Sequence, residues 1–387
     1  MTGALDKTVS ELLATLVSFD TTSAKSNLAL IDFVRDYLEG HGVTSTLTPS
    51  ADGAKASLFA SIGPAGDGGI GLSAHSDCVP VEGQSWDSDS FTLTPRDGKL
   101  YARGSCDMKG FLACVLASVP RFKARPLKEP LHIILSYDEE VGCSGVRPLI
   151  ARLGQDLPKP RAVIVGEPSS MEVIDAHKRI DAYTTTVTGK EAHSSVPQLG
   201  VNAIAYAAEL ILELLRIGAD LAAKESDPRF DPPCSTLQAG TIEGGTALNI
   251  VPKTCSLQWQ LRSLPAADPE LPARRLDAFI ATSLLPRMRQ VAPKASIETA
   301  HAVAVPAFQA PAGSGAVALA VSITGRNATR AVSYGTEAGL FEAAGVPAVI
   351  CGPGAIAQAH AADEFVTVEQ LQACMAFLER LTERTRA

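Results

Sequence analysis

The sequence predicts an α/β protein in which helices flank a mostly parallel sheet and a smaller α+β domain is inserted. The 387 residues exceed what one hydrophobic core usually fills, so two domains are expected. Up to residue 176, and again from 304, all-apolar segments alternate with helical ones, which is typical of a parallel sheet covered on both faces. After that first stretch, a Thr-rich segment with alternating polar and apolar residues indicates half-exposed antiparallel strands. The expected domains are 1–176 with 304–387, and 177–303.

The first expected domain combines helical spacing of apolar residues with short buried strands. Residues 91–104 alternate around the tight-turn pair Asp97-Gly98, which predicts a hairpin. The other strand candidates are continuous apolar runs, as expected of strands buried on both faces. The expected helices span 12–16, 28–38, 106–122, 145–153 and 368–384, and the expected strands span 57–63, 69–75, 131–137, 161–168, 328–334 and 347–354.

The inserted domain is expected to be ferredoxin-like. Its segments follow the order β-α-β-β-α-β, which defines that unit. The expected strands are 181–189, 235–245, 254–264 and 294–303, and the expected helices are 200–217 and 268–288.

Composition and charge restrict the class of partner. The chain carries 42 acidic against 34 basic residues, a net charge of −8, and no basic cluster interleaved with aromatic residues, so we expect no nucleic-acid or anionic-membrane partner. Asp6 and Glu11 interrupt the amino-terminal segment where a secretory signal would be apolar, and no run reaches the roughly 18 apolar residues that a bilayer span needs. The eight cysteines form no C-x-x-C pair, which favours reduced thiols in a cytoplasmic protein.

Side chains that can bind a divalent metal follow several of the parallel-type strands. Ligands of an open α/β sheet bind at the carboxyl ends of its strands, so these side chains are expected to meet there. Each has a plainer explanation by itself: Asp107 could cap a helix, His75 could be a buried imidazole, and His360 could be an exposed loop residue. The set comprises His75, Asp77, Asp107, Glu139, Glu140, Glu167 and His360.

The charge of this set favours a pair of cations. Five ionised carboxylates at one sheet edge repel each other strongly unless cations offset them. Two histidines with carboxylates suit two Zn²⁺ ions, or Co²⁺ or Mn²⁺ in their place, better than Ca²⁺, which takes oxygen ligands only. Asp107 is the natural bridge between two such ions, which share a water.

The pair Glu139-Glu140 is expected to divide two tasks. In extended backbone, consecutive side chains point to opposite sides, so one carboxylate can bind a metal while the other acts as general base. Asp77, two residues after His75, is expected to hold that imidazole in place.

Six segments in the same order resemble the aminoacylase and acetylornithine deacetylase family of dimetal hydrolases over essentially the whole chain. They are "AHSDCVP", "LYARGSCDMKG", "YDEEVGCSG", "VGEPS", "EAHSSVPQLGVNAI" and "GGTALNIVP". The resemblance implies a zinc-exopeptidase-like fold in which His75 and Glu167 bind one zinc, Glu140 and His360 bind the other, and Asp107 bridges them.

The resemblance also implies roles around the metals. Glu139 is expected to be the base, and 177–303 is expected to act as lid and homodimerisation surface. His193 in "AHSS" is expected to reach the substrate across the dimer and stabilise the oxyanion. Asn249 and Arg262 are similar to lid residues that hold the substrate carboxylate, a task that suits a bidentate guanidinium.

The segment "SYGTEAGLF" bears on the substrate. Succinyl-diaminopimelate desuccinylases carry an arginine where this chain has Leu340, which favours a short, uncharged acyl group. The segment is most similar to acetylornithine deacetylases, which implies hydrolysis of N2-acetyl-L-ornithine in arginine biosynthesis. Gly335 and Glu337 are then expected at the substrate, with Glu337 near its cationic side chain.

Several alternatives stay open at this level. Another N-acyl amino acid, such as acetylcitrulline or succinyl-diaminopimelate, is one, and a dipeptide or carboxypeptidase substrate is a second. A binding protein that keeps the fold without the chemistry belongs to a different class. A cysteine hydrolase using Cys106 or Cys78 is disfavoured because neither thiol lies in a nucleophile motif.

Overall fold

The computed structural model describes residues 5–386 and divides into two compact units. The first unit contains the chain up to Ala176, Phe308–Arg330 and the chain from Thr336 onward, and the second contains His177–Ala307 and Ala331–Gly335. Residues 304–307 and 331–335 therefore pack with the second unit, whereas the sequence boundaries assigned them to the first. Residues 1–4 and 387 of the expected first domain lie outside the described residues.

The first unit is built on a mixed sheet whose centre is parallel, as predicted. In the order β1-β2-β6-β3-β7-β15-β8-β13, the neighbours β6, β3, β7 and β15 run parallel to one another, and the pairs of β1 with β2, β2 with β6 and β15 with β8 are antiparallel. The strands are β1 Ser45–Pro49, β2 Ala56–Ile62, β3 Ile70–His75, β6 Leu131–Ser136, β7 Ala162–Pro168, β8 Ile174–His177, β13 Phe308–Gln309 and β15 Ala348–Gly352, with β14 Arg330–Val332 beside β8.

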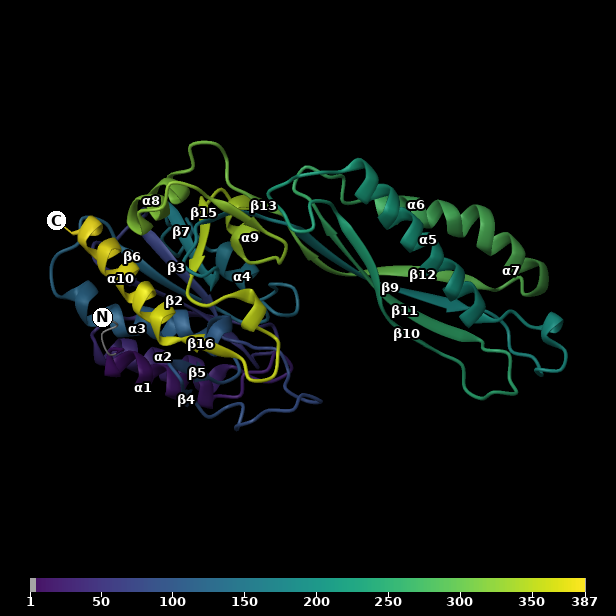
Figure 1. Ribbon diagram of the computed structural model, residues 1–387, viewed down its shortest axis with the longest axis horizontal. Helices are drawn as coiled ribbons and strands as arrows, with labels where there is room; N and C mark the ends of the chain where they lie inside the picture. The colour runs from purple at the N-terminus through teal and green to yellow at the C-terminus, as the bar shows by residue number, and fades with distance from the viewer. Residues whose placement is uncertain (1–4, 387) are drawn as a thin grey trace. The chain divides into compact units, whose positions relative to one another are not determined.

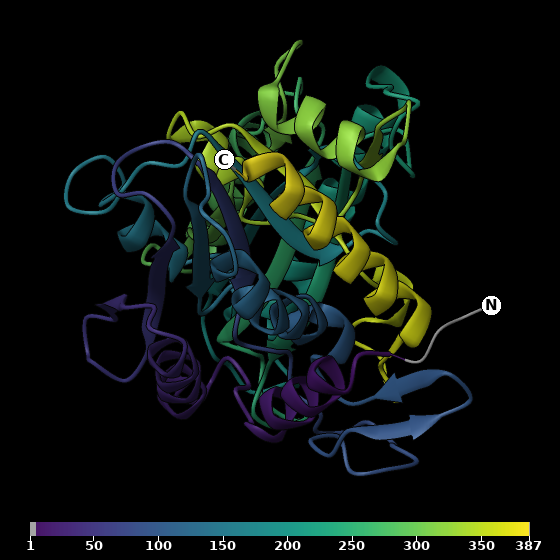
Figure 2. The same cartoon turned by 90° about the vertical axis from the view of Figure 1, so that its left-hand side faces the viewer.

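Helices cover both faces of this sheet, which explains why its central strands are apolar at almost every position. One face packs against α1 Lys7–Ser18, α2 Leu28–Gly40, α3 Gly110–Lys123, α8 Gly315–Thr324 and α10 Val368–Thr385. The other face packs against α4 Val146–Ile150 and α9 Ala338–Ala343. The carboxy-terminal α10, yellow in Figures 1 and 2, lies against α3.

The predicted hairpin is confirmed and joins a third strand far away in the sequence. β4 Thr94–Arg96 pairs with β5 Lys99–Tyr101, and β5 also pairs with β16 Phe365–Thr367. This small sheet holds the carboxy-terminal loop next to the segment that follows β5.

The second unit has the predicted ferredoxin-like arrangement. Its antiparallel sheet has the order β10-β11-β9-β12, and the chain order is β-α-β-β-α-β as expected. Trp259 lies in the hydrophobic core of this unit and stacks on Tyr183 with 4.1 Å between ring centroids. The elements are β9 Arg179–Thr188, α5 Ala203–Lys224, β10 Thr236–Gly244, β11 Thr254–Ser263, α6 Leu271–Phe279, α7 Leu285–Val291 and β12 Ser296–Val305.

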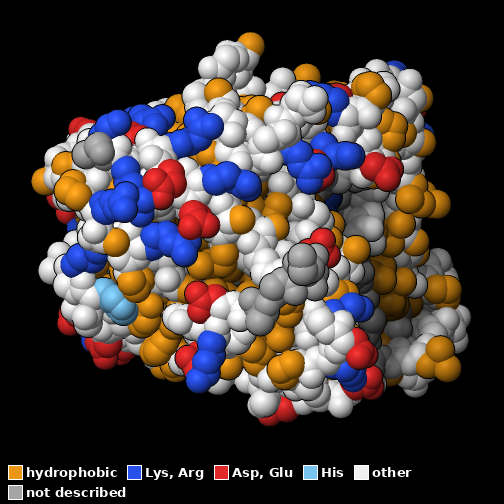
Figure 3. Space-filling view, turned by 60° about the vertical axis from the view of Figure 1, so that its left-hand side comes forward, with side chains coloured by type: hydrophobic (Ala, Val, Ile, Leu, Met, Phe, Trp, Pro, Cys, Tyr) orange, Lys and Arg blue, Asp and Glu red, His pale blue; other side chains and the backbone are white. Residues whose placement is uncertain are grey.

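Three features bear on the expectations from composition: the surface charges, the cysteines and the hydropathy of the helices. Figure 3 shows basic and acidic side chains intermixed on the viewed face. The eight cysteines are free, and all but Cys234 are buried. In the part of the chain that the structure describes, no helix is long and apolar enough to cross a bilayer.

Candidate active site

The predicted metal-binding side chains of the first unit meet at the carboxyl end of its parallel strands. His75 is the last residue of β3, Glu167 lies at the end of β7, and the Glu139-Glu140 pair is in the turn after β6. β6, β3 and β7 are neighbours in the sheet, so their ends lie side by side. Asp107 and His360 come from two further loops and complete the cluster.

Asp107 lies between the two imidazoles and offers one oxygen to each. Its Oδ1 is 3.0 Å from His75 Nε2, and its Oδ2 is 3.3 Å from His360 Nε2. His75 Nε2 is also 3.8 Å from Glu167 Oε1, and His360 Nε2 is 2.9 Å from Glu140 Oε2. Glu167 thus lies next to His75, Glu140 lies next to His360, and Asp107 contacts both imidazoles.

Asp107 does not cap a helix, so the alternative that it serves only as a helix N-cap is wrong. The expected helix 106–122 begins only at Gly110, and the residue in the N-cap position is Lys109. Asp107 has an extended conformation (φ −121°, ψ 91°) in the irregular segment Ser105–Lys109, and its side chain is 7% exposed. Its carboxylate is therefore left for the two imidazoles.

The expected extended backbone at Glu139-Glu140 is wrong. A turn follows β6, with Asp138 in the left-handed region (φ 56°), and the N–H groups of Gly142 and Cys143 donate to the Glu139 carbonyl. The short turn nevertheless sends the two carboxylates to different neighbours. Glu139 lies within 4.8 Å of ligand atoms of His75 and Glu167, whereas Glu140 lies within the same distance of His75 and Asp107.

Asp77 supports the site through both its backbone and its side chain. His75 Nδ1 is 3.0 Å from the Asp77 carbonyl oxygen and 3.5 Å from its carboxylate, so the carbonyl is the closer partner of the imidazole. An Nδ1–H donated to that carbonyl leaves Nε2 free to bind a metal. The Asp77 carboxylate accepts the backbone N–H groups of Glu139 (3.2 Å) and Glu140 (3.3 Å) and the hydroxyl of Ser23 (2.7 Å). Sequence reasoning missed Ser23, which has no metal-binding signal.

The role expected of Glu337 at the substrate stays a prediction, and the structure shows what its carboxyl contacts. Its side chain is 1% exposed, and its carboxyl accepts hydrogen bonds from the hydroxyls of Ser136, at the end of β6, and Ser73, in β3. Burial raises the pKa of Glu337 to about 7. This carboxyl therefore lies inside the unit and links β3 to β6.

The protein's own charges strongly shift the imidazole pKa values. Contacts with Asp107 and Glu140 raise the pKa of His360 to about 10. Burial opposes the charged form of His75, yet hydrogen bonds with Asp107 and Asp77 raise its pKa well above the usual value. In both cases the surrounding carboxylates favour the positively charged form of the imidazole.

The carboxylates fit the chemistry of a cation site. Burial raises the pKa of Glu140 to about 7 and the pKa values of Glu139 and Glu167 well above usual. Glu167 Oε1 is buried, and it has no hydrogen-bond partner among the described residues. A buried carboxylate oxygen without a partner is costly, and a divalent cation beside it removes that cost. The donor set of imidazoles and carboxylates therefore fits a metal centre.

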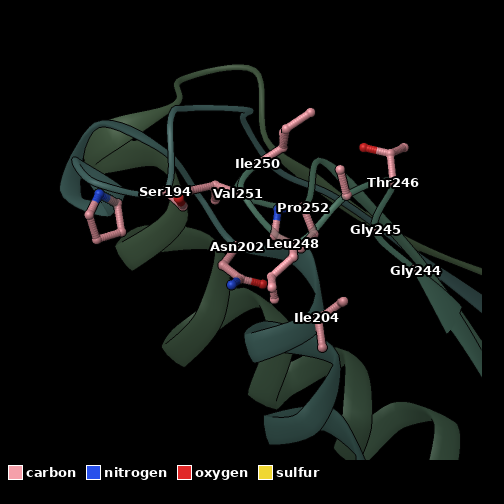
Figure 4. Close-up of a pocket in the computed structure, with 12 residues that line it drawn as sticks. Ser194, Asn202, Ile204, Gly244, Gly245, Thr246, Leu248, Ile250, Val251 and Pro252 are labelled. Atoms are coloured by element: carbon pink, nitrogen blue, oxygen red, sulfur yellow. The ribbon is translucent and has the colours of Figure 1, made fainter.

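The predicted substrate residues of the second unit lie in two places within that unit. The His193 segment pairs with the segment after Asn249, because Ser194 N–H donates to the Asn249 carbonyl at 3.1 Å and Val251 N–H donates to the Ala192 carbonyl. Next to them is a pocket of about 650 Å³, in which Ser194, Leu248 and Ile250 line the wall together with the start of α5 (Figure 4).

Arg262 has a different neighbourhood. Its Nη1 donates to the Ser333 carbonyl at 3.3 Å, which places it beside the segment that ends at Gly335. Gly335 packs so closely on Ile180 that a Cβ there would lie 2.6 Å from the Ile180 Cδ1 atom. The roles of His193, Asn249, Arg262 and Gly335 stay predictions.

A parallel α/β sheet that gathers two histidines and several carboxylates at its carboxyl edge defines the class of metal-dependent hydrolases. A family model narrows this class, because the model of peptidase family M20/M25/M40 matches residues 71–384. The chain belongs to that family.

Relatives agree with this membership, and solved structures share the fold. The chain is 36% identical to an acetylornithine deacetylase of Myxococcus xanthus, over 95% of each chain, and 34% identical to one of Proteus mirabilis, over 96% of this chain and 92% of that one. An M20 family metallo-carboxypeptidase of Sulfolobus solfataricus has a TM-score of 0.75 at 17% identity, covering 98% of this chain and 99% of that one. The YXEP protein of Bacillus subtilis, a dinuclear metal binding peptidase, has a TM-score of 0.60 at 16% identity, covering 97% and 96%.

Proposed function

We propose that the protein hydrolyses N2-acetyl-L-ornithine to L-ornithine and acetate. The observation that carries this proposal is the 36% identity to an acetylornithine deacetylase along 95% of both chains. The intact cluster of imidazoles and carboxylates supports hydrolysis over mere binding, since every position expected of a metal ligand is filled. The resemblance of the sequence to these deacetylases also supports a place in arginine biosynthesis.

We propose two divalent cations, Zn²⁺ first and Co²⁺ or Mn²⁺ as alternatives. His75 and Glu167 would hold one, His360 and Glu140 the other, and Asp107 would contact both, because its two oxygens face the two imidazoles. Bound cations polarise the amide carbonyl and make the attacking water more acidic.

The chain's own residues then move the proton. Glu139, buried next to His75 and Glu167, takes the proton of the attacking water and later donates it to the departing amine. Its raised pKa, caused first by burial, favours a carboxylate that accepts a proton readily. Asp77 fixes the backbone N–H groups of the turn that carries Glu139, so the base keeps its direction.

Leu340 supports a small acyl group. It lies in α9, where desuccinylases have an arginine for the succinyl carboxylate, and offers no positive charge.

The metal-free protein is expected to be inactive and to regain acetylornithine turnover as two equivalents of Zn²⁺ or Co²⁺ are added, because the water and the carbonyl both need a cation. The measurement is release of ornithine against metal added, with N-acetylcitrulline, succinyl-diaminopimelate and a dipeptide under the same conditions. Preference for a dipeptide would defeat the deacetylase assignment, and full activity in the presence of a strong chelator would defeat the metal assignment.

We further propose a homodimer formed through the second unit. Its helix α5 exposes Leu212 (66%) and Leu215 (56%) to solvent, and paired exposed leucines on one helix favour a protein contact. Leu212→Glu is expected to shift the protein from dimer to monomer in sedimentation velocity. A wild-type protein that sediments as a monomer at micromolar concentration would contradict the proposal.

We propose a cytoplasmic location as well. The eight free thiols support it, because reduced cysteines are typical of proteins kept in a reducing compartment.

A further inference from the structure

A buried ion pair lies behind the candidate metal centre and takes no part in the proposed reaction. Arg103 and Glu364 are each 1% exposed, and Arg103 Nη1 donates to Glu364 Oε2 at 2.7 Å. Burial and the nearby Asp107 raise the pKa of Glu364, whereas Arg103 lowers it. Burying two charges is costly even when they are paired, so their other contacts are informative.

Glu364 holds the loop that carries Asp107. Its Oε1 accepts the backbone N–H groups of Cys106 (2.8 Å) and Asp107 (3.1 Å). The backbone at Asp107 and Met108 is not helical, so the regular hydrogen bonds of a helix do not fix this segment. The Glu364 carboxylate supplies that constraint instead.

Arg103 and Gln84 hold the loop that carries His360. Gln84 Nε2 donates to the His360 carbonyl at 2.9 Å, and Arg103 Nη1 donates to the Ala361 carbonyl at 3.3 Å. Arg103 Nη2 also donates to Gln84 Oε1 at 2.5 Å. His360 follows a short 3₁₀ turn, and its side chain is 51% exposed, so neither sheet pairing nor deep burial locates it.

We propose that Arg103, Gln84 and Glu364 form a positioning clamp that fixes the Asp107 loop and the His360 loop relative to each other. The inference rests on the proposed function and deepens it, because these loops carry the bridging carboxylate and one imidazole. No clamp residue touches the reacting atoms. The clamp acts by holding the ligands in place before a cation binds, and such outer contacts typically change metal affinity about 10- to 100-fold.

The clamp members act on different parts of the centre. Glu364 acts through Asp107, whose two oxygens face both imidazoles. Gln84 contacts a metal-ligand residue only at the carbonyl of His360, and its own oxygen accepts from Arg103 and Trp86. Removing the Glu364 charge should therefore weaken the binding of both cations. Removing the Gln84 donor should weaken the binding of only the cation next to His360.

Calorimetric titration of the metal-free, full-length protein with Co²⁺ tests this pattern. For Glu364→Gln, whose amide places a donor against a backbone N–H or against Arg103, we expect both affinities to fall about 10- to 100-fold. For Gln84→Met, a half-buried substitution that should fold normally, we expect one affinity to fall by a similar factor and the other to stay within about twofold of wild type.

Leu381→Ala is the matched structural control. Leu381 is a fully buried residue of α10, and its truncation destabilises the first unit while leaving the clamp intact. It should lower Tm and leave both Co²⁺ affinities unchanged. The clamp is overturned if Glu364→Gln binds two equivalents with wild-type affinity, or if Leu381→Ala weakens binding as much as Glu364→Gln does. A wild-type protein that binds no Co²⁺ would instead overturn the proposed function itself.

Discussion

Glu139→Gln is expected to lower kcat by about 10²- to 10⁴-fold while two metal equivalents stay bound. The amide cannot accept the proton of the attacking water, but its size and its place in the turn after β6 are unchanged. Glu139 lies within 4.8 Å of ligand atoms of His75 and Glu167, close enough to contact the reacting atoms. We expect Asp107, Glu140 and Glu167 to hold the cations without it. Steady-state kinetics and metal analysis of the same preparation measure both quantities.

Glu129→Gln is the matched control for this variant. Glu129 belongs to the same unit, is partly exposed, and pairs with Arg161 far from the cluster, so its substitution removes one carboxylate charge without touching the reaction. We expect wild-type kcat and metal content for it. Equal loss of metal and activity in Glu139→Gln would show that Glu139 is a ligand and that another group is the base.

The sequence predicted the clustering of the ligands because that clustering follows from topology. His75 and Glu167 end neighbouring parallel strands, and such ends must meet at one edge of the sheet. The ferredoxin-like unit was equally accessible, since its strands and helices carry strong periodic patterns. In contrast, β13, with only the two residues Phe308–Gln309, is too short for any pattern to indicate.

Side-chain direction was not accessible from the sequence. The motif around Glu337 indicates a functional segment, but only the structure shows that its carboxyl accepts hydrogen bonds from a hydroxyl of β3 and one of β6. The turn at Glu139-Glu140 is a similar case. Asp138 adopts the left-handed conformation, and the sequence has no glycine at this position that would indicate it. Backbone contacts such as those of Asp77 and Glu364 are likewise long-range, joining positions up to 258 residues apart.

Asp107→Asn is expected to abolish the binding of both cations at micromolar metal and to reduce activity by about 10⁴-fold or more. An asparagine side chain has a single acceptor oxygen and a donor NH₂ group, so it can face one imidazole site but cannot serve the two sites that Oδ1 and Oδ2 face now. The measurement is metal content after dialysis, together with ornithine release at increasing metal concentration.

His360→Ala is the comparison for Asp107→Asn, because His360 is expected to bind one cation whereas Asp107 is expected to contact both. His360 contacts Glu140 and one oxygen of Asp107, so its loss should remove one equivalent and leave the cation held by His75 and Glu167. Because the clamp contacts the backbone carbonyl of residue 360, the alanine variant keeps that hydrogen bond and changes only the imidazole. Two equivalents in Asp107→Asn, or none in His360→Ala, would contradict a centre in which one carboxylate is shared by two cations.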